Sequence, residues 1–199
     1  MSRTIGIVMF ENAEELDFVG PWEVLAAGVK DGDRVVSVAE HTNPIRCAKG
    51  LRVVADHTFD DCPDLDVIVV PGGLGSRAEM HNPAMLDFVR RQATHTTWTT
   101  SVCTGAFILF GAGLLEGKTA TTHWAAFDEL RGHAPDLDLD PEARWVVQGD
   151  VVTSAGVSAG IDMALWLLGQ LYDPTHARVT QRYIQYEPAP PYQHVPLPA

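Results

Sequence analysis

The sequence predicts an α/β fold with a mainly parallel central sheet. Strand-like and helix-like stretches alternate along the 199 residues, which is typical of such folds. The most apolar strand-like stretches, residues 4–10 and 66–70, alternate poorly between apolar and polar positions, as strands buried on both faces do. In sheets of this kind ligands bind beyond the carboxyl ends of the strands, so the turns that follow the strands are where a site is expected.

The expected strands are short runs of β-branched and apolar residues bounded by turn residues. Glycine-containing turns at Lys49-Gly50 and Gly149-Asp150 each predict a hairpin. In order, the strands are residues 4–10, 34–39, two short pieces within 41–62, 66–70, a stretch that leads to Cys103, 119–122, and the pair 145–147 and 151–153.

The expected helices are recognised by their end signals. Asn82-Pro83 and Asp173-Pro174 combine a capping side chain with a proline that suits a first turn. Pro21 is expected in the first turn of a helix that includes residues 22–27, and Gly117 is expected to end another. The full set is 22–27, 83–93, 107–115, 123–131, 161–171 and 174–187.

Composition bounds the class of protein. Residues 1–199 are expected to form a single domain, since 46% of them are hydrophobic and no linker or repeat divides the chain. The formal net charge of −12 argues against nucleic acid or an anionic membrane as the main partner. No apolar run approaches the roughly 18 residues of a membrane span, and the N-terminus lacks a signal-peptide pattern, so a cytoplasmic protein is expected.

The cysteines and histidines predict no metal site. Cys47, Cys62 and Cys103 are odd in number and far apart, which fits neither a disulfide framework nor a zinc motif. The eight histidines are scattered without ligand spacing. No phosphate-binding or dinucleotide-binding loop is present.

Cys103 is the candidate nucleophile. It stands between a strand-like run and an apolar helix, where a sharp turn exposes its corner residue, and Gly105 lets the helix pack close to the strand. Backbone N–H groups at a helix N-terminus stabilise a thiolate, so the pKa of the thiol is expected to be lowered. The alternative is a buried cysteine that packs as a small hydrophobic residue, which is the commoner fate of a lone cysteine.

Other chemistry-bearing residues also follow strands. Asp17 lies between Leu16 and Phe18, so we expect it to be partly buried with a raised pKa; a helix cap or solvated charge is an equally good interpretation. The Gly72-Gly73 turn can bring backbone N–H groups close to a ligand. We expect these residues, Cys103 and Gly156 to converge on one edge of the sheet.

The motifs resemble those of the ThiJ/PfpI superfamily, which has a class I glutamine-amidotransferase-like fold. The resemblance runs from about residue 5 to residue 191. It rests on Ser101-Val102-Cys103-Thr104-Gly105, Pro71-Gly72-Gly73, Ala120-Thr121-Thr122-His123-Trp124, Leu16-Asp17-x-x-Gly20-Pro21, Ala159-Gly160-Ile161-Asp162 and Tyr186-Glu187-Pro188. It implies a flavodoxin-like three-layer sandwich with a nucleophile elbow at Cys103, and a homodimer.

Two departures narrow the expected activity. Many members carry histidine directly after the cysteine, where this chain has Thr104, and many place glutamate near the thiol, where this chain has Asp17. Both choices resemble the branch that hydrates isocyanides, and they argue against peptidase, amidotransferase and glyoxalase activity.

The resemblance implies a reaction in which the Cys103 thiolate attacks the terminal carbon of an isocyanide and Asp17 supplies the proton. Thr104 then donates a hydrogen bond, and Gly73 and Gly156 offer backbone groups to the substrate or to the water. His123 is expected to contact residues of the site and not the substrate. The expected apolar pocket wall is Phe18, Trp22 and Val157. We expect no cofactor, because the implied reaction oxidises nothing and moves no phosphate. The alternatives are a ligand-sensing domain, as in transcription regulators that use this fold, and a thiol-based stress protein in which Cys103 is oxidised.

Overall fold

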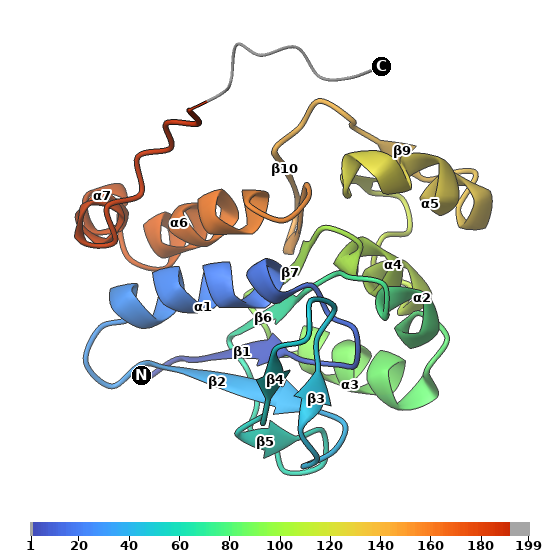
Figure 1. Ribbon diagram of the computed structural model, residues 1–199, viewed down its shortest axis with the longest axis horizontal. Coiled ribbons are helices and arrows are strands. Elements are labelled where there is room, and N and C mark those ends of the chain that lie inside the picture. The colour runs from blue at the N-terminus through green and yellow to red at the C-terminus, as the bar shows by residue number, and fades with distance from the viewer. Residues whose placement is uncertain (1, 192–199) are drawn as a thin grey trace.

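The computed structural model describes residues 2–191 and confirms the α/β fold. Seven strands form one sheet in the order β10-β11-β7-β6-β1-β2-β5 (Figure 1). Every neighbouring pair is parallel except β10 and β11, which form the predicted hairpin. The strands are β1 (Thr4–Val8), β2 (Arg34–Ala39), β5 (His57–Thr58), β6 (Val67–Val70), β7 (Trp98–Val102), β10 (Trp145–Gln148) and β11 (Val151–Ser154).

Helices cover both faces of the sheet, which gives three layers. Figure 1 shows α1, α6 and α7 together on one face and α2, α3 and α4 on the other, with α5 beyond α4. The helices are α1 (Glu15–Gly28), α2 (Ser76–Glu79), α3 (Pro83–Ala93), α4 (Gly105–Gly111), α5 (Phe127–His133), α6 (Ala159–Leu171) and α7 (Pro174–Tyr183). A 3₁₀ helix, η1 (Trp124–Ala126), precedes α5.

Two small ladders lie outside the main sheet. The antiparallel pair β3 (Ile45–Arg46) and β4 (Arg52–Val53) is the hairpin predicted around Lys49-Gly50. The parallel pair is β8 (Thr119–Ala120) and β9 (Asp138–Leu139).

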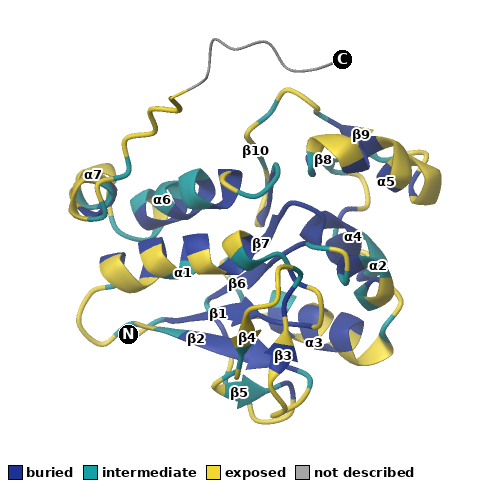
Figure 2. Ribbon diagram, viewed as in Figure 1, coloured by how far each residue is buried: buried dark blue, intermediate teal, exposed yellow. Residues whose placement is uncertain are grey.

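The core sits between the sheet and its two helical layers. Every residue of β1 and β6 is buried (Figure 2), which explains their poor alternation, because a strand covered on both faces has no solvated side. The caps also form as predicted: the Asn82 side chain accepts the N–H of Ala84, and that of Asp173 accepts the N–H of His176. No helix within residues 2–191 is long and apolar enough to cross a bilayer.

The start of α1 differs from the prediction. The helix begins at Glu15, so Asp17 lies in its first turn and Pro21 lies inside it. Acidic side chains suit a helix N-terminus, and Pro21 packs beside Gly160 of α6, so tertiary packing outweighs the missing backbone donor. The segments β5, β9 and α2 were not predicted, because two to four residues carry no readable periodicity.

Candidate active site

Cys103 occupies the predicted elbow between β7 and α4. Its φ of +57° is in the left-handed region, which is strained for a residue with a Cβ. Its N–H donates to the carbonyls of Ser154 and Ala155 at 3.1 and 3.2 Å, and its carbonyl accepts the Thr122 hydroxyl at 2.9 Å. A methyl group at Gly105 would lie 2.2 Å from the Val70 carbonyl oxygen, so glycine allows the close approach of α4 to the sheet.

Hydrogen-bond donors surround the sulfur. The N–H groups of Thr104 and Val157 both act on the thiol and favour its ionised form. Val157 follows β11, the parallel neighbour of β7, and has a φ of +52°. Two adjacent strand ends thus carry left-handed residues that meet at the Cys103 sulfur.

Asp17 reaches the same point from the first turn of α1. Its side chain is fully buried, and Oδ2 accepts the N–H of Gly72 at 2.9 Å. The Cys103 thiol is a hydrogen-bonding neighbour of this carboxyl, yet within residues 2–191 no donor reaches Oδ1 with the geometry of a formed hydrogen bond. One carboxyl oxygen is therefore fixed by Gly72, while the other has no hydrogen-bond partner among the described residues.

The pKa of Asp17 is raised to about 7, mainly because burial disfavours the carboxylate, while the hydrogen bonds from Gly72 and Cys103 offset part of that effect. The predicted burial and raised pKa are confirmed, and a solvated charge is excluded.

The predicted lowering of the thiol pKa is wrong. Burial and the charge of Asp17 raise the pKa of Cys103 to about 12, because together they exceed the effect of the surrounding donors. At neutral pH the thiol therefore keeps its proton and faces a carboxyl that is close to half ionised. Two acids this close titrate as a pair, and the pair holds one proton when Asp17 is ionised.

Thr104 and the glycine turn after β6 hold this pair in place. The Thr104 hydroxyl accepts the N–H of Gly73 at 2.9 Å and donates to the Gly73 carbonyl at 3.1 Å. A methyl group at Gly72 would lie 2.4 Å from the Thr104 nitrogen and 2.9 Å from Asp17 Oδ2. Only glycine lets the backbone donate to Asp17 at this distance.

A cleft of about 340 Å³ opens above the sulfur. Four predicted site residues other than His123 line it: Gly73, Cys103, Thr104 and Val157. Gly72 lies behind them against Asp17. The expectation that these strand ends converge on one edge is confirmed; the roles of the residues remain predictions.

His123 lies in the cleft wall itself, although it was placed behind the site in the prediction. Its Nδ1 accepts the N–H of Ala125 at 3.2 Å, which leaves the proton on Nε2. Burial and then the charge of Arg77 lower its pKa, so the ring is neutral at physiological pH. Gly156 packs against this ring, and a methyl group there would lie 2.1 Å from His123 Cδ2.

The predicted pocket wall of Phe18 and Trp22 needs correction. Both residues line a different hollow, together with Met9, Val53 and Val54. Because Asp17 is helical, the next residue on the chain turns away from the thiol by about 100°, and Phe18 is buried in the core instead.

Six residues of the cleft were missed: Glu14, Lys49, Leu74, Arg77, Ala125 and Ala126. Leu74 directly follows the predicted Gly73, and Glu14 precedes the predicted Asp17 by three residues. Ala125 and Ala126 lie within three residues of His123, so all four were within reach of a sequence argument. Lys49 lies in the β3–β4 turn, which its ion pair with Glu14 (2.6 Å) ties to the start of α1. Arg77 lies in α2 and pairs with Glu129 of α5 at 2.6 Å. Such long-range pairings leave no local pattern.

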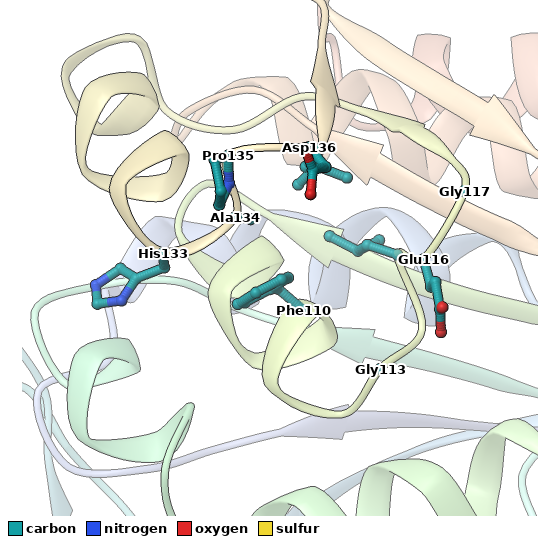
Figure 3. Close-up of a pocket in the computed structure, with 10 residues that line it drawn as sticks. Phe110, Gly113, Glu116, Gly117, His133, Ala134, Pro135 and Asp136 are labelled. Atoms are coloured by element: carbon teal, nitrogen blue, oxygen red, sulfur yellow. The ribbon is translucent and has the colours of Figure 1, made fainter.

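Another hollow, of about 370 Å³, is separate from this site (Figure 3). It lies between the end of α4 and the α5–β9 segment and is lined by residues such as Phe110, Glu116, His133 and Asp136. It contains none of the predicted site residues. Among residues 2–191 no group of three or more histidine, cysteine, aspartate or glutamate side chains is placed to hold a metal ion.

Comparisons with known proteins agree with this geometry. Residues 3–170 match the DJ-1/PfpI family. The chain is 42% identical over 193 residues to the isonitrile hydratase of Pseudomonas putida, covering 96% of this chain and 82% of that protein. It is 29% identical over 164 residues to the HTH-type transcriptional regulator CdhR of Pseudomonas aeruginosa, covering 82% of this chain and 44% of the regulator.

A solved structure shows the same architecture. The crystal structure of a ThiJ/PfpI family protein from Pseudomonas syringae superposes with a TM-score of 0.89 at 34% identity, over 97% of this chain and 78% of that one. The chain belongs to the DJ-1/PfpI family.

Proposed function

We propose that this protein hydrates isocyanides to N-substituted formamides. The observation that carries the proposal is the buried pair of Cys103 and Asp17, in which a thiol at a strained elbow faces a carboxyl with a raised pKa. The 42% identity to an isonitrile hydratase over nearly the whole chain supports it.

The first step adds the thiol across the isocyanide carbon. As the Cys103 sulfur bonds to the terminal carbon of R–N≡C, its proton passes to the ionised Asp17 and from there to that carbon. The product is a thioimidate, R–N=CH–S–Cys103, and Asp17 is a carboxylate again. A carboxyl with a pKa near 7 suits this relay, because it accepts and returns a proton at similar cost.

The second step releases the product. Asp17 takes a proton from water as the oxygen attacks the thioimidate carbon and passes that proton to the nitrogen, which gives R–NH–CH(OH)–S–Cys103. Collapse forms the C=O bond, the hydroxyl proton passes through Asp17 to the departing sulfur, and R–NH–CHO and the free thiol result. The Thr104 and Val157 N–H groups that act on the sulfur stabilise it as it leaves. Atoms balance as one isocyanide and one water per formamide, and no step needs a cofactor.

The experiment is a turnover screen of the purified protein over small isocyanides, nitriles, aldehydes and amides. We expect formamide from isocyanides and no reaction above background with the other classes. Cys103→Ala is the control and should be inactive. Formation of formamide at the wild-type rate by Cys103→Ala would overturn the proposal.

The screen also separates two rival functions. The regulator CdhR is similar over this domain, so a sensing role is the leading alternative; it predicts saturable binding without turnover. A thiol-based stress role predicts protection from electrophiles without turnover. An oxidised Cys103 alone does not discriminate, because a cysteine that lines the cleft can be oxidised whichever function the protein has.

We also propose that the protein acts as a homodimer on a small-molecule substrate, as the family resemblance implies. Sedimentation velocity of the purified protein tests this, and a single species of monomer mass across micromolar concentrations would contradict it.

A further inference from the structure

The segment that joins β1 to α1 is held between two neighbours (Figure 1). On one side lies the β3–β4 hairpin, whose Ala48 N–H donates to the Ala13 carbonyl at 2.9 Å. On the other side lies the glycine turn after β6, whose Gly72 carbonyl accepts the Glu14 N–H at 2.9 Å. Because the N–H of the same glycine holds the carboxyl of Asp17, this segment connects the hairpin to the site.

Lys49, in the turn of the hairpin, contacts the first residues of the helix. Its Nζ lies 2.6 Å from Glu14 Oε2. Its N–H donates to Glu15 Oε1 at 2.7 Å, and the Leu51 N–H donates to the same oxygen at 3.3 Å. One hairpin residue therefore holds both the residue that precedes α1 and the first residue of that helix.

No local signal fixes the start of α1. Glu14 is the N-cap residue, yet its side chain makes no capping hydrogen bond, so the free N–H groups of the first turn lack the partner that usually fixes a helix start. Pro21 is typical of a first turn, whereas α1 begins at Glu15. The position of the first turn, and of Asp17 within it, therefore depends on tertiary contacts such as those of Lys49.

We propose that Lys49 is a positioning residue for Asp17. By holding Glu14 and Glu15 it keeps the first turn of α1 where the carboxyl meets the Cys103 thiol. This inference rests on the proposed hydratase function and adds a residue to it. The Lys49 side chain is 70% exposed, so losing its ion pair should cost little folding stability. The effect should appear in the rate instead.

The charge of Lys49 provides a second readout. Burial raises the pKa of Asp17 to about 7; the Gly72 N–H and the Cys103 thiol lower it, the charge of Glu14 raises it and that of Lys49 lowers it. Removing the lysine charge should therefore raise this pKa further, and removing the Glu14 charge should lower it. The two substitutions break the same ion pair but move the pKa of Asp17 in opposite directions.

The first test measures the kinetics of Lys49→Met with cyclohexyl isocyanide between pH 5 and 9. We expect kcat on the alkaline plateau to fall about tenfold, because a displacement of about 1 Å costs roughly a hundredfold and a partial one costs less. KM should change less than about twofold. The acid limb of kcat/KM should move to higher pH. Lys49→Arg keeps a cation that can pair with Glu14 and should restore both the rate and the limb.

Two further variants and a control isolate the ion pair. Glu14→Gln should lose as much kcat as Lys49→Met but move the limb to lower pH. The double variant should lose no more kcat than either single one, because both break one interaction. Lys118→Met removes the same charge outside the cleft and should match the wild-type protein. Urea denaturation should give every variant nearly the wild-type stability.

The second test does not depend on hydratase activity. Alkylation of Cys103 by iodoacetamide, followed by peptide mass spectrometry between pH 5 and 9, reports the ionisation of the pair, because the thiol proton must pass to Asp17. The rate in the wild-type protein should rise towards pH 7 and then level. The limb should move to higher pH in Lys49→Met and stay in place in Lys49→Arg and Lys118→Met.

The outcomes separate the two claims. If no isocyanide is turned over but the alkylation limb moves in Lys49→Met, the proposed function fails and the positioning role stands. If isocyanides are turned over while Lys49→Met behaves as Lys118→Met in both assays, the positioning role is overturned and the hydratase stands. A higher KM with kcat and limb unchanged would instead assign Lys49 to substrate binding. Lost stability with unchanged kinetics would assign it to folding alone, and either result overturns the proposal.

Discussion

The carboxyl of Asp17 lies against the thiol of Cys103, and both groups are buried, with exposed fractions of 0% and 6%. Asp17 lies in the first turn of α1 and Cys103 directly follows β7, and the Gly72 N–H holds the carboxyl in place through Oδ2. Burial raises both pKa values. Because two neighbouring anions in a buried site repel, this arrangement favours a pair that holds one proton and can move it.

The rate should depend on the ionisation of Asp17. Its pKa is about 7, and only the carboxylate can accept the thiol proton. We therefore expect kcat/KM for cyclohexyl isocyanide to rise about tenfold per pH unit below 7 and to level above it. Stopped assays of formamide between pH 5 and 9, corrected for the reaction without enzyme, measure this profile.

Glu14→Gln provides the control for that profile. The charge of Glu14 raises the pKa of Asp17 and that of Lys49 lowers it, so removing Glu14 should shift the acid limb to lower pH. A flat profile in the wild-type protein would contradict the relay.

Stability should fall as pH rises through the same range. The pKa of Asp17 is 3.8 in the unfolded chain and about 7 in the folded one, so the folded state binds the proton more tightly. The resulting stabilisation is fully present below pH 3.8 and is lost as pH rises through 7. Between pH 5 and pH 8 we expect the free energy of unfolding to decrease by about 2–3 kcal/mol more in the wild-type protein than in Asp17→Asn. Urea denaturation at both pH values tests this. An equal decrease in the free energy of unfolding in the two proteins would show that folding does not raise the pKa of Asp17.

Replacing Gly72 by alanine should disable the site. The added methyl group would lie 2.4 Å from the Thr104 nitrogen and 2.9 Å from Asp17 Oδ2, so the carboxyl and the Thr104 backbone must move. Since misplacement by about 1 Å costs roughly a hundredfold in rate, we expect at least that loss of kcat. Gly132→Ala in α5 is the matched control, because nothing lies within 4 Å of its added methyl group, and it should keep full activity. Equal kinetics for the two variants would count against the tight packing around Asp17.

The Thr104 hydroxyl should act through both of its hydrogen bonds to Gly73. Thr104→Ser keeps the hydroxyl and should retain most of the rate and stability. Thr104→Val leaves the Gly73 N–H without the acceptor that lies at 2.9 Å in the wild-type protein and should cost about 1–3 kcal/mol of unfolding free energy together with activity. Urea denaturation and turnover of both variants measure this, and a valine variant as stable and active as the serine variant would exclude the role.

Much of the architecture can be predicted from the sequence. Strand β2 and helix α3 lie where their apolar run and their Asn82-Pro83 cap placed them, because those signals are local. The elbow at Cys103 was predictable for the same reason, since a strand, a corner residue and a glycine stand next to one another in the chain.

The electrostatics of the site could not be predicted in this way. A helix N-terminus indicates a lowered thiol pKa, but the burial of Cys103 and the charge of Asp17 reverse the direction, and both depend on tertiary packing. The sequence placed Pro21 in the first turn of the helix, whereas α1 begins at Glu15. This earlier start changes the direction in which the side chains of Phe18 and Trp22 point. The pairs of Lys49 with Glu14 and of Arg77 with Glu129 join segments 35 and 52 residues apart, so no sequence pattern reports them.

The account depends most on a covalent bond between substrate and Cys103 that forms with the help of Asp17. Rapid quenching of the protein with cyclohexyl isocyanide, followed by peptide mass spectrometry, measures it directly. We predict that the Cys103 peptide gains the mass of one isocyanide before formamide accumulates, and that this signal is absent in Cys103→Ala and forms far more slowly in Asp17→Asn. Formamide production at the wild-type rate with no adduct on Cys103, or an unchanged rate in Asp17→Asn, would contradict the account.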